Sequence, residues 1–154
     1  MATYFFDSSG LVKRYVNEIG SAWVINVVNP RTNNRVYVAR ITGVEVVSAI
    51  TRQGRSGSLS ASDVASALAQ FRHDFMNEYR VVEISPTLIN RAMTLAETQA
   101  LRGYDAVQLA AAIEVNVRRL TSRMPTLTLI SADAALNAVA TAEGLAVDNP
   151  NFHP

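Results

Sequence analysis

The chain opens with the segment ATYFFDSSG, residues 2–10, which joins a short apolar run to the start of a helical pattern. The run at 2–6 is aromatic and β-prone, so it predicts a buried strand. Asp7 follows this run directly, although folding does not require a carboxylate at the exit of a buried strand. Open α/β sheets place their chemistry at the carboxyl ends of their strands. Asp7 is therefore the first candidate functional residue.

The rest of the chain repeats this alternation of strand and helix. Further strands are expected at 35–39, 80–84, 126–130 and 145–147, and helices at 9–18, 21–28, 41–53, 60–79, 86–101, 105–120 and 133–143. Helices of this length between strands favour parallel strands with right-handed crossovers. We therefore predict the α/β class, as a three-layer α/β/α sandwich with a central, mostly parallel sheet. Residues 1–148 are expected to form a single domain and residues 149–154 an irregular C-terminal tail.

Several short signals predict where the helices begin and end. Ser60 and Asp63 have the spacing of a capping box. Ser85 is an expected N-cap, because Pro follows it at the first helical position. Gly103 and Gly144 are expected to stop the helices that precede them.

Composition excludes several classes of site. The chain has 154 residues, a usual length for one domain. It has no cysteine, which excludes disulfides, zinc–thiolate sites and thiol catalysis. The N-terminus lacks the basic segment of a signal peptide. No apolar stretch reaches the roughly 18 residues of a membrane span, so we expect a soluble, cytoplasmic protein without membrane contact.

The charge pattern does not decide whether the protein binds nucleic acid. The net charge is only +1, which does not itself suggest a nucleic-acid partner. However, 13 of the 14 basic residues are Arg, and Lys13 is the one Lys. The rigid fork of Arg suits phosphate. A GC-rich genome explains the same bias equally well.

Three more acids, Glu45, Asp105 and Asp133, stand where strands end or helices begin, and each of the four acids has a possible structural explanation. Asp7 could cap the first helix, and Glu45 lies three residues after Thr42, as in a capping box. Asp105 lies in the first turn of its helix, where a carboxylate interacts favourably with the helix dipole. Asp133 could be an N-cap.

Taken together, the four acids are not explained by stability. In a parallel sheet these positions lie near one edge, close to the switch point. Two like charges about 4 Å apart repel by roughly 4 kcal/mol at an effective dielectric constant of 20, whereas a helix cap contributes only about 1 kcal/mol. A hard cation with oxygen ligands, such as Mg²⁺, would explain the cluster. Without metal, some of these carboxyls should bind protons at a raised pKa.

Four segments resemble, in order and spacing, the motifs of PIN-domain ribonucleases, and in particular the VapC-type toxins of type II toxin–antitoxin pairs. The segments are YFFDSSGLVKRY (4–15), TGVEVVSA (42–49), RGYDAVQLA (102–110) and LISADAAL (129–136). The resemblance implies Mg²⁺- or Mn²⁺-dependent cleavage of RNA phosphodiester bonds by an endoribonuclease. It also implies an RNA substrate, a cognate antitoxin protein and a homodimer.

The resemblance assigns residues as well. The expected catalytic and metal-binding acids are Asp7, Glu45, Asp105 and Asp133. The expected substrate-binding residues are Ser8, Ser9, Arg14, Arg102 and Ser131. Arg40 and Arg52, outside the motifs, are further candidates for holding the RNA backbone. His73 and His153 are expected to have surface or packing roles.

Two departures from the family pattern leave questions open. Gln108 stands where many relatives have His, so the role of that His in substrate contact does not carry over. Ala132 and Ala134 flank Asp133, so a fifth carboxylate is missing and the number of metals stays open.

Three other functions are compatible with part of the sequence pattern. A phosphohydrolase of the haloacid dehalogenase type needs a second Asp where this chain has Ser9. A receiver domain needs an acidic pair and a late Lys, whereas this chain has only Lys13. The serious alternative is a catalytically silent PIN-like module that binds RNA or protein.

Overall fold

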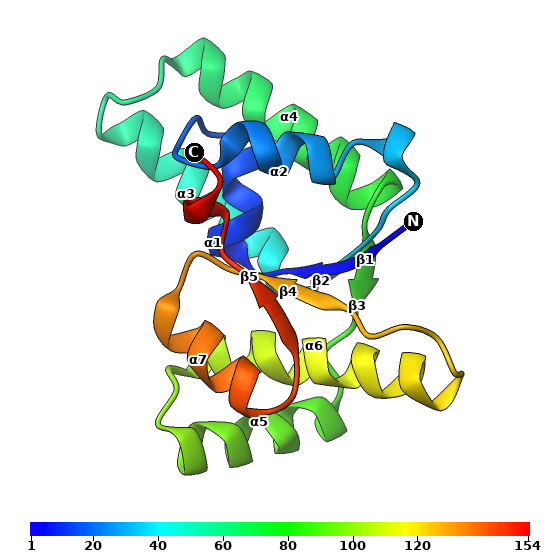
Figure 1. The fold of residues 1–154 in the computed structure, drawn as a ribbon. Helices are drawn as coiled ribbons and strands as arrows, with labels where there is room; N and C mark the ends of the chain where they lie inside the picture. Colours follow the sequence, from blue (N-terminus) through cyan, green and yellow to red (C-terminus); the bar gives the residue numbers. More distant parts are fainter.

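A computed structural model, which describes all 154 residues, shows one five-stranded sheet between two layers of helices (Figure 1). All strand pairs are parallel, and the order across the sheet is β3-β2-β1-β4-β5. The strands are β1 (Thr3–Phe6), β2 (Arg35–Ala39), β3 (Arg80–Val82), β4 (Thr128–Ile130) and β5 (Ala146–Asp148). The predicted α/β/α sandwich is confirmed, with a sheet that is parallel throughout.

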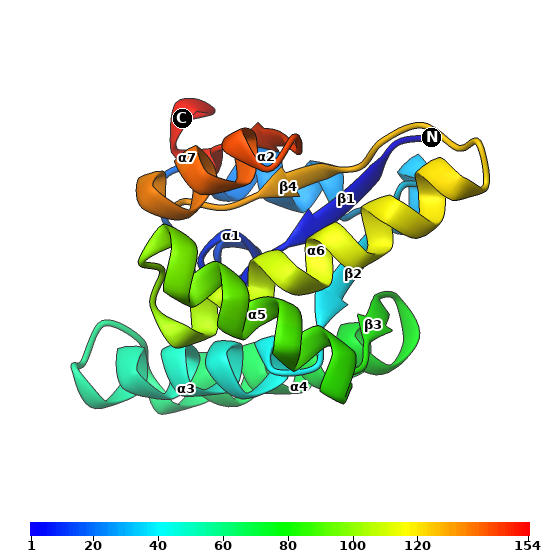
Figure 2. The same ribbon diagram turned by 90° about the horizontal axis from the view of Figure 1, so that it is seen from below.

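Seven α-helices and three short 3₁₀ turns connect the strands. They are α1 (Ser8–Leu11), η1 (Val12–Arg14), α2 (Ser21–Val27), η2 (Pro30–Thr32), α3 (Thr42–Arg55), α4 (Ala61–Asn77), α5 (Pro86–Gln99), α6 (Gly103–Thr121), α7 (Ala134–Ala142) and η3 (Pro150–Phe152). Helices α1 to α4 cover one face of the sheet, and α5, α6 and α7 cover the other (Figures 1 and 2).

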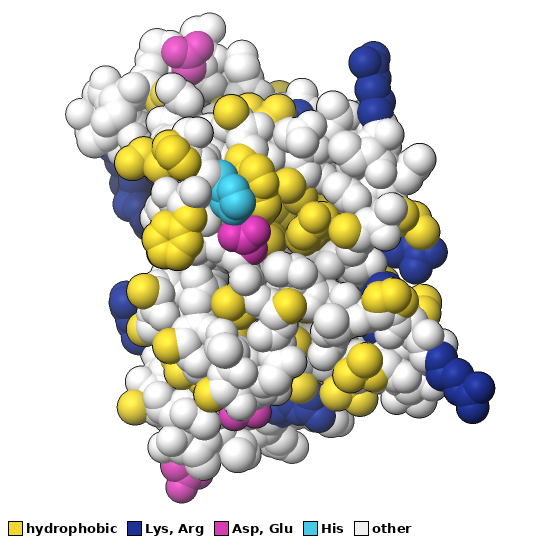
Figure 3. All heavy atoms as spheres, in the orientation of Figure 1, with side chains coloured by type: hydrophobic (Ala, Val, Ile, Leu, Met, Phe, Trp, Pro, Cys, Tyr) yellow, Lys and Arg dark blue, Asp and Glu magenta, His cyan; other side chains and the backbone are white.

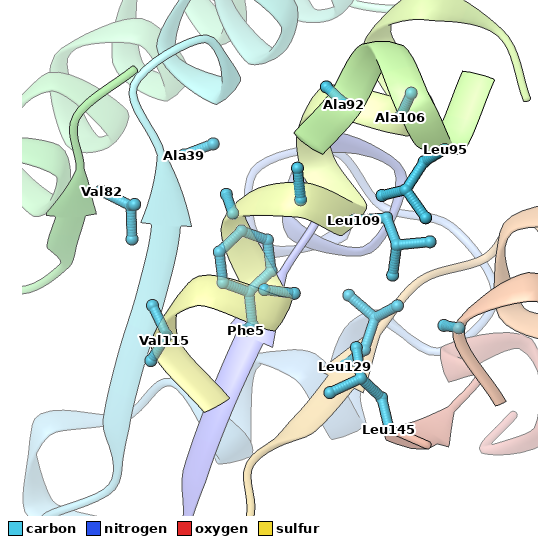
Figure 4. Packing of buried hydrophobic residues seen from close by; sticks show 14 of the residues in the cluster. Phe5, Ala39, Val82, Ala92, Leu95, Ala106, Leu109, Val115, Leu129 and Leu145 are labelled. Atoms are coloured by element: carbon cyan, nitrogen blue, oxygen red, sulfur yellow. The ribbon is translucent and has the colours of Figure 1, made fainter. Parts of the chain in front are cut away.

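The central strand β1 explains the two layers, because its neighbouring aromatic residues serve opposite faces. Phe5 lies in the core beneath α5, α6 and α7, where it packs with residues such as Leu109 and Leu129 (Figure 4). Phe6 lies in the second core with Leu11 and Ile50. Both phenylalanines are fully buried. Burying both faces of β1 places its carboxyl end, and hence Asp7, deep in the molecule.

Two of the expected element boundaries are wrong. The helix expected at 9–18 is short: α1 ends at Leu11, and a 3₁₀ turn replaces its continuation. Gly103 does not stop a helix, because Ala100, in the left-handed region at φ 53°, already ends α5. Gly103 is instead the first residue of α6. The Ser60 and Ser85 caps and the left-handed Gly144 agree with the prediction.

The C-terminal segment 149–154 is more ordered than expected. Residues Pro150–Phe152 form a 3₁₀ turn that packs on α2. The rings of His153 and Trp23 stack with centroids 4.2 Å apart, and His153 Nε2 lies 2.8 Å from Asp148 Oδ1. Figure 3 shows this face, where apolar side chains surround a histidine that touches an acidic side chain. His153 therefore has the packing role that the sequence suggests.

None of the helices is long and apolar enough to cross a membrane.

Candidate active site

The four acids reach one edge of the sheet because each follows the carboxyl end of a strand or opens a helix there. Asp7 directly follows β1, and Asp133 follows β4, the neighbour of β1. Glu45 lies in the first turn of α3, and Asp105 in the first turn of α6. The chain leaves β1 toward β2 on one side and returns to β4 on the other. Asp7 therefore stands at the switch point of the sheet, where open α/β folds bind ligands.

Asp7 is buried and held by several donors. Its side chain is 3% exposed. Ser131 Oγ donates to Oδ2 at 2.7 Å, the Gly10 amide to Oδ1 at 2.8 Å, and Ser9 Oγ lies 2.8 and 2.9 Å from the two oxygens. Burial, with a smaller contribution from the charge of Asp105, raises the pKa of Asp7 to about 6, because the loss of hydration outweighs these hydrogen bonds. In the absence of metal this carboxyl therefore takes up its proton at about pH 6, well above the pH at which an ordinary Asp does so, and is mostly ionised at pH 7.

Gly10 allows the turn after Asp7 to lie directly on β4. A Cβ atom at this position would stand 2.7 Å from the carbonyl oxygen of Ile130. The same carbonyl accepts the Asp7 amide at 3.2 Å. Only a residue without a side chain lets α1 approach this closely. The approach brings Ser9 within reach of Ser131, across the site from a segment far away in the sequence.

Glu45 is oriented from two directions. Ser8 Oγ donates to Oε2 at 3.1 Å, and Gln108 Nε2 donates to Oε1 at 2.7 Å. The expected capping box at Thr42 does not form, because Ile41 is the N-cap of α3 and makes no side-chain cap. Thr42 is buried instead and accepts a hydrogen bond from Gln108 Nε2 at 2.9 Å. Glu45 is therefore held toward the site rather than back along its helix.

Asp105 is the common neighbour of the other acids. Its pKa is raised, chiefly by burial, then by the negative charge of Asp133, and to a lesser degree by Glu45. Arg102 opposes this shift, because its guanidinium lies 3.8 Å from Asp105 and 3.9 Å from Asp133. Asp133 also caps α7, accepting the Leu136 amide at 3.0 Å, which is the structural role that the sequence left open for it.

The donor set suits a hard divalent cation. All four side chains offer carboxylate oxygens, the ligands that Mg²⁺ and Mn²⁺ prefer, and no His or Cys competes. The structure contains no group of three Asp, Glu, His or Cys side chains preassembled for a metal ion. Arg102 lies 3.8 Å from Asp105 and 3.9 Å from Asp133 and partly balances the charge of these two acids. The residues therefore fit the cation by the chemistry of their oxygen donors, which lie at the same edge of the sheet without forming a ready-made metal-binding group.

An open cleft of about 710 Å³ reaches this edge of the sheet, and Glu45 is the one of the four acids that lines it. Its walls come from α1, η1, the exposed side of α3 and the start of α6, and Asn151 of the C-terminal segment lies at its rim. Ser8, Ser9 and Glu45 line it directly, while Asp7 lies beneath them. Substrate entering the cleft would therefore meet the two serines and Glu45 first.

The residues expected to bind substrate fall into two groups. Ser8 and Ser9 line the cleft, and Arg102 is exposed beside Asp105 and Asp133. Ser131 is fully buried, so it positions Asp7 rather than contacting substrate. Arg14 is not brought to the cleft, because it lies beside the buried Asp74 and lines a different hollow.

Arg40 is also drawn away from the acids, because it pairs with Glu83. Arg52, in contrast, lines the cleft.

Sequence reasoning missed the positions of three residues. Gln108 marks the absence of a His in the sequence, but it directly orients Glu45; its place three residues after Asp105, on the same face of a helix, could have indicated this. Lys13 is buried at the cleft wall and pairs with Glu18 at 3.1 Å. Nothing in the sequence pattern indicates that Asn151 reaches the cleft.

Several known proteins share this fold. PAE2754 from Pyrobaculum aerophilum matches with a TM-score of 0.65 and 18% identity, over 98% of this chain and 85% of that chain. VapBC2 from Rickettsia felis, crystallised with a DNA fragment from its promoter, has a TM-score of 0.61 and 16% identity, over 96% and 98%. FitAcB from Neisseria gonorrhoeae has a TM-score of 0.64 and 15% identity, over 98% and 99%. At these identities the likeness establishes the fold alone.

Sequence comparison establishes the family. No protein-family model matches the chain. Two curated proteins do: Ribonuclease VapC45 and Ribonuclease VapC49, from two strains of Mycobacterium tuberculosis. Each is 33% identical over 115 residues, which span 75% of this chain and 78% of the relative. The chain therefore belongs to the VapC family of PIN-domain ribonucleases.

Proposed function

We propose that this VapC-family protein is an endoribonuclease that hydrolyses RNA phosphodiester bonds with a divalent cation, Mg²⁺ or Mn²⁺, and acts as the toxin of a toxin–antitoxin pair. The observation that carries the proposal is that Asp7, Glu45, Asp105 and Asp133, from four separate segments of the chain, meet at one edge of the sheet. There Ser9 and Ser8, which are adjacent in α1, bond Asp7 and Glu45, and Arg102 lies between Asp105 and Asp133. The curated relatives are named ribonucleases, which supports the reaction class.

Asp7 and Asp105 would hold the principal cation, with Glu45 and Asp133 completing the set directly or through water. When bound, the cation supplies charge neutralisation at the phosphate and lowers the pKa of the attacking water. No side-chain nucleophile is needed for this hydrolysis.

The chain's own contribution is to hold its carboxylates ready for the ion. Ser131 and the Gly10 amide fix the orientation of Asp7. Gln108 and Ser8 do the same for Glu45. Hydrogen bonds from a second layer of residues commonly change metal affinity or activity by 10- to 100-fold. These partners therefore belong to the proposed machinery, although they do not touch the ion.

We also propose a cognate antitoxin and a homodimer as assembly states of this protein. The VapBC2 neighbour, which is bound to a DNA fragment from its promoter, supports the protein partner. Light scattering over a range of protein concentrations tests the dimer: a mass that stays at 16.7 kDa would contradict it.

The reaction is tested by a titration of Mg²⁺ into the protein with a labelled structured RNA, followed by gel analysis. Cleavage should require the cation and stop with a chelator. Asp105→Asn should lower the rate by at least 100-fold, because it removes the acid that all the others share. Asp63→Asn is the matched control, since Asp63 also lies in a helix's first turn but outside the cleft.

Two outcomes would contradict the proposal. Cleavage that survives in Asp105→Asn would place the reaction elsewhere. Tight RNA binding without any cleavage, at saturating Mg²⁺ or Mn²⁺, would favour the silent binding module instead.

A further inference from the structure

The catalytic cleft continues as a trough along one helix. A second hollow, of about 330 Å³, lies beside the first. The two hollows share four lining residues, Val12, Glu18, Ala49 and Arg52. Because they share these walls, they form one continuous depression, which begins at the acids and runs away from them. We call this depression the α3 trough.

The long wall of the trough is one face of α3. The α3 residues that line it are Glu45, Ser48, Ala49, Arg52, Gln53 and Ser56, the last just beyond the helix end, with Val44 at the rim. Their spacing of three and four residues places them on one side of the helix. From the first to the last, this side is about 16 Å long. A chain-like ligand lying along it would extend well beyond the reacting bond.

The trough carries one cation that no carboxylate neutralises. Lys13 is paired with Glu18, so those two charges cancel. Arg52 has no acid within ion-pair distance; its Nη1 donates to Ser48 Oγ at 2.9 Å, which directs the side chain back along the trough. The guanidinium fork binds phosphate oxygens well. Arg52 lies seven residues from Glu45, about 10 Å along the helix.

The shape of the trough suits a single strand. Its opposite wall is the α1–η1 segment, which packs directly against α3. Asp7 lies at the bottom, 3% exposed, so a reacting phosphate must descend between these walls. Unpaired RNA can be drawn out in this way, whereas duplex RNA is bound over its outer surface. Tyr104, 64% exposed at the catalytic end, offers a ring on which an unpaired base can stack.

We propose that Arg52 is a substrate-positioning residue, which holds a backbone phosphate of the RNA beyond the cleaved bond, in the wall of the α3 trough. This proposal rests on the proposed ribonuclease function and names a further residue that positions its substrate.

Binding measurements test this role of Arg52 separately from cleavage. The parent protein is Asp105→Asn, titrated into a fluorescein-labelled oligoribonucleotide without self-complementarity and followed by fluorescence anisotropy. Each phosphate contact with single-stranded RNA contributes about 0.7 to the slope of log K against log salt concentration. Adding Arg52→Gln should reduce the slope by about 0.7 and weaken binding roughly tenfold at low salt. Arg52→Lys should restore most of the slope.

Arg55→Gln is the matched control, because Arg55 is exposed on the same helix but lines neither hollow. It should leave the slope unchanged. Tyr104→Leu should weaken binding without changing the slope, since stacking does not depend on counterions.

An unchanged slope in Arg52→Gln, or an equal loss in Arg55→Gln, would overturn the role of Arg52. Neither result affects the Mg²⁺-dependent cleavage assay, so failure of the Arg52 proposal and failure of the ribonuclease proposal are distinguishable.

Discussion

Asp7 shows how a functional residue can oppose folding. Its carboxylate is buried among hydroxyl and amide donors, yet these do not fully replace its lost hydration, because its pKa remains raised to about 6. A residue selected for stability would have its pKa lowered, as most native carboxylates do. The cost is explained if a cation, rather than a proton, is the natural partner of this group.

Asp7→Asn should therefore stabilise the metal-free protein at neutral pH. The pKa of Asp7 rises from 3.8 in the unfolded chain to about 6 in the folded protein, so the folded state binds more protons between these values. The stability that protonated Asp7 contributes falls as the pH rises from about 4 to about 6. Above pH 6 the free energy of unfolding of the metal-free protein is therefore lower by about 3 kcal/mol. Urea unfolding in chelator, at pH 4 and pH 7, measures this.

In that experiment the variant should gain stability at pH 7 and little at pH 4, while RNA cleavage falls by orders of magnitude. Asn retains the capping oxygen for the Gly10 amide, and the neighbouring hydroxyls can rotate to accept from its amide. Marked destabilisation at pH 7 would instead show that Asp7 is needed for folding.

Gln108→Leu should separate positioning from folding. Gln108 is 1% exposed and holds Glu45 at 2.7 Å, so its loss frees that carboxylate in a site of like charges. We expect the half-saturating Mg²⁺ concentration for cleavage to rise 10- to 100-fold. Cleavage rates across a Mg²⁺ titration measure the shift. A fall in maximal rate without any shift in Mg²⁺ dependence would contradict this role.

At the scale of elements, short local devices aim each acid. The turn after β1 is held against β4 by the hydrogen bond from the Asp7 amide to the Ile130 carbonyl, and Gly10 leaves the room for this approach. The first turns of α3 and α6 present Glu45 and Asp105 from opposite sides of the sheet (Figure 1). The site therefore depends on where helices begin more than on their interiors.

Gly10→Ala should disturb this arrangement. The added methyl group meets backbone rather than a flexible side chain, so α1 must move away from β4. Overpacking of this kind typically costs about 1–3 kcal/mol, and cleavage should fall as well, because Ser8 and Ser9 move with α1. Thermal unfolding and a cleavage assay measure both effects.

Gly103→Ala is the matched control, since a Cβ atom there would meet nothing within 4 Å and the residue belongs to a helix. It should raise stability slightly, by about 0.5 kcal/mol. Equal effects of the two substitutions would mean that the contact of Gly10 with β4 is unimportant.

At the scale of the whole molecule, the order of the strands produces the site. Crossing from β3 back to β4 beside β1 brings the C-terminal third of the chain against the N-terminal segment. Hydrogen bonds such as that from Ser131 to Asp7 then span 124 residues of sequence. A ligand that binds all four acids must therefore link both halves of the fold.

Mg²⁺ should accordingly stabilise the whole protein. A ligand at 100 times its Kd adds about 2.7 kcal/mol to the free energy of unfolding, which raises Tm by several degrees for a domain of this size. Differential scanning fluorimetry at pH 7, with and without Mg²⁺ at constant ionic strength, measures the shift. Asp105→Asn should lose it and Asp63→Asn should keep it; an equal shift in both would place the ion elsewhere.

The sequence by itself determined the alternation of strand and helix, the parallel sheet and the identity of the four acids. Periodicity and capping signals act within a few residues, so they are readable from one chain. They fail at the end of α5, where Ala100 takes the left-handed conformation and ends the helix before Gly103, the residue that was expected to stop it.

Only the tertiary structure decided which side chains meet the acids. It buried Ser131 beneath Asp7, turned Gln108 to Glu45 and paired Arg14 with Asp74 outside the cleft. It also brought the α3 face with Arg52 into line with the cleft. The physical reason is that these partners are separated by many residues, so strand order and helix packing, rather than local preference, set their distances.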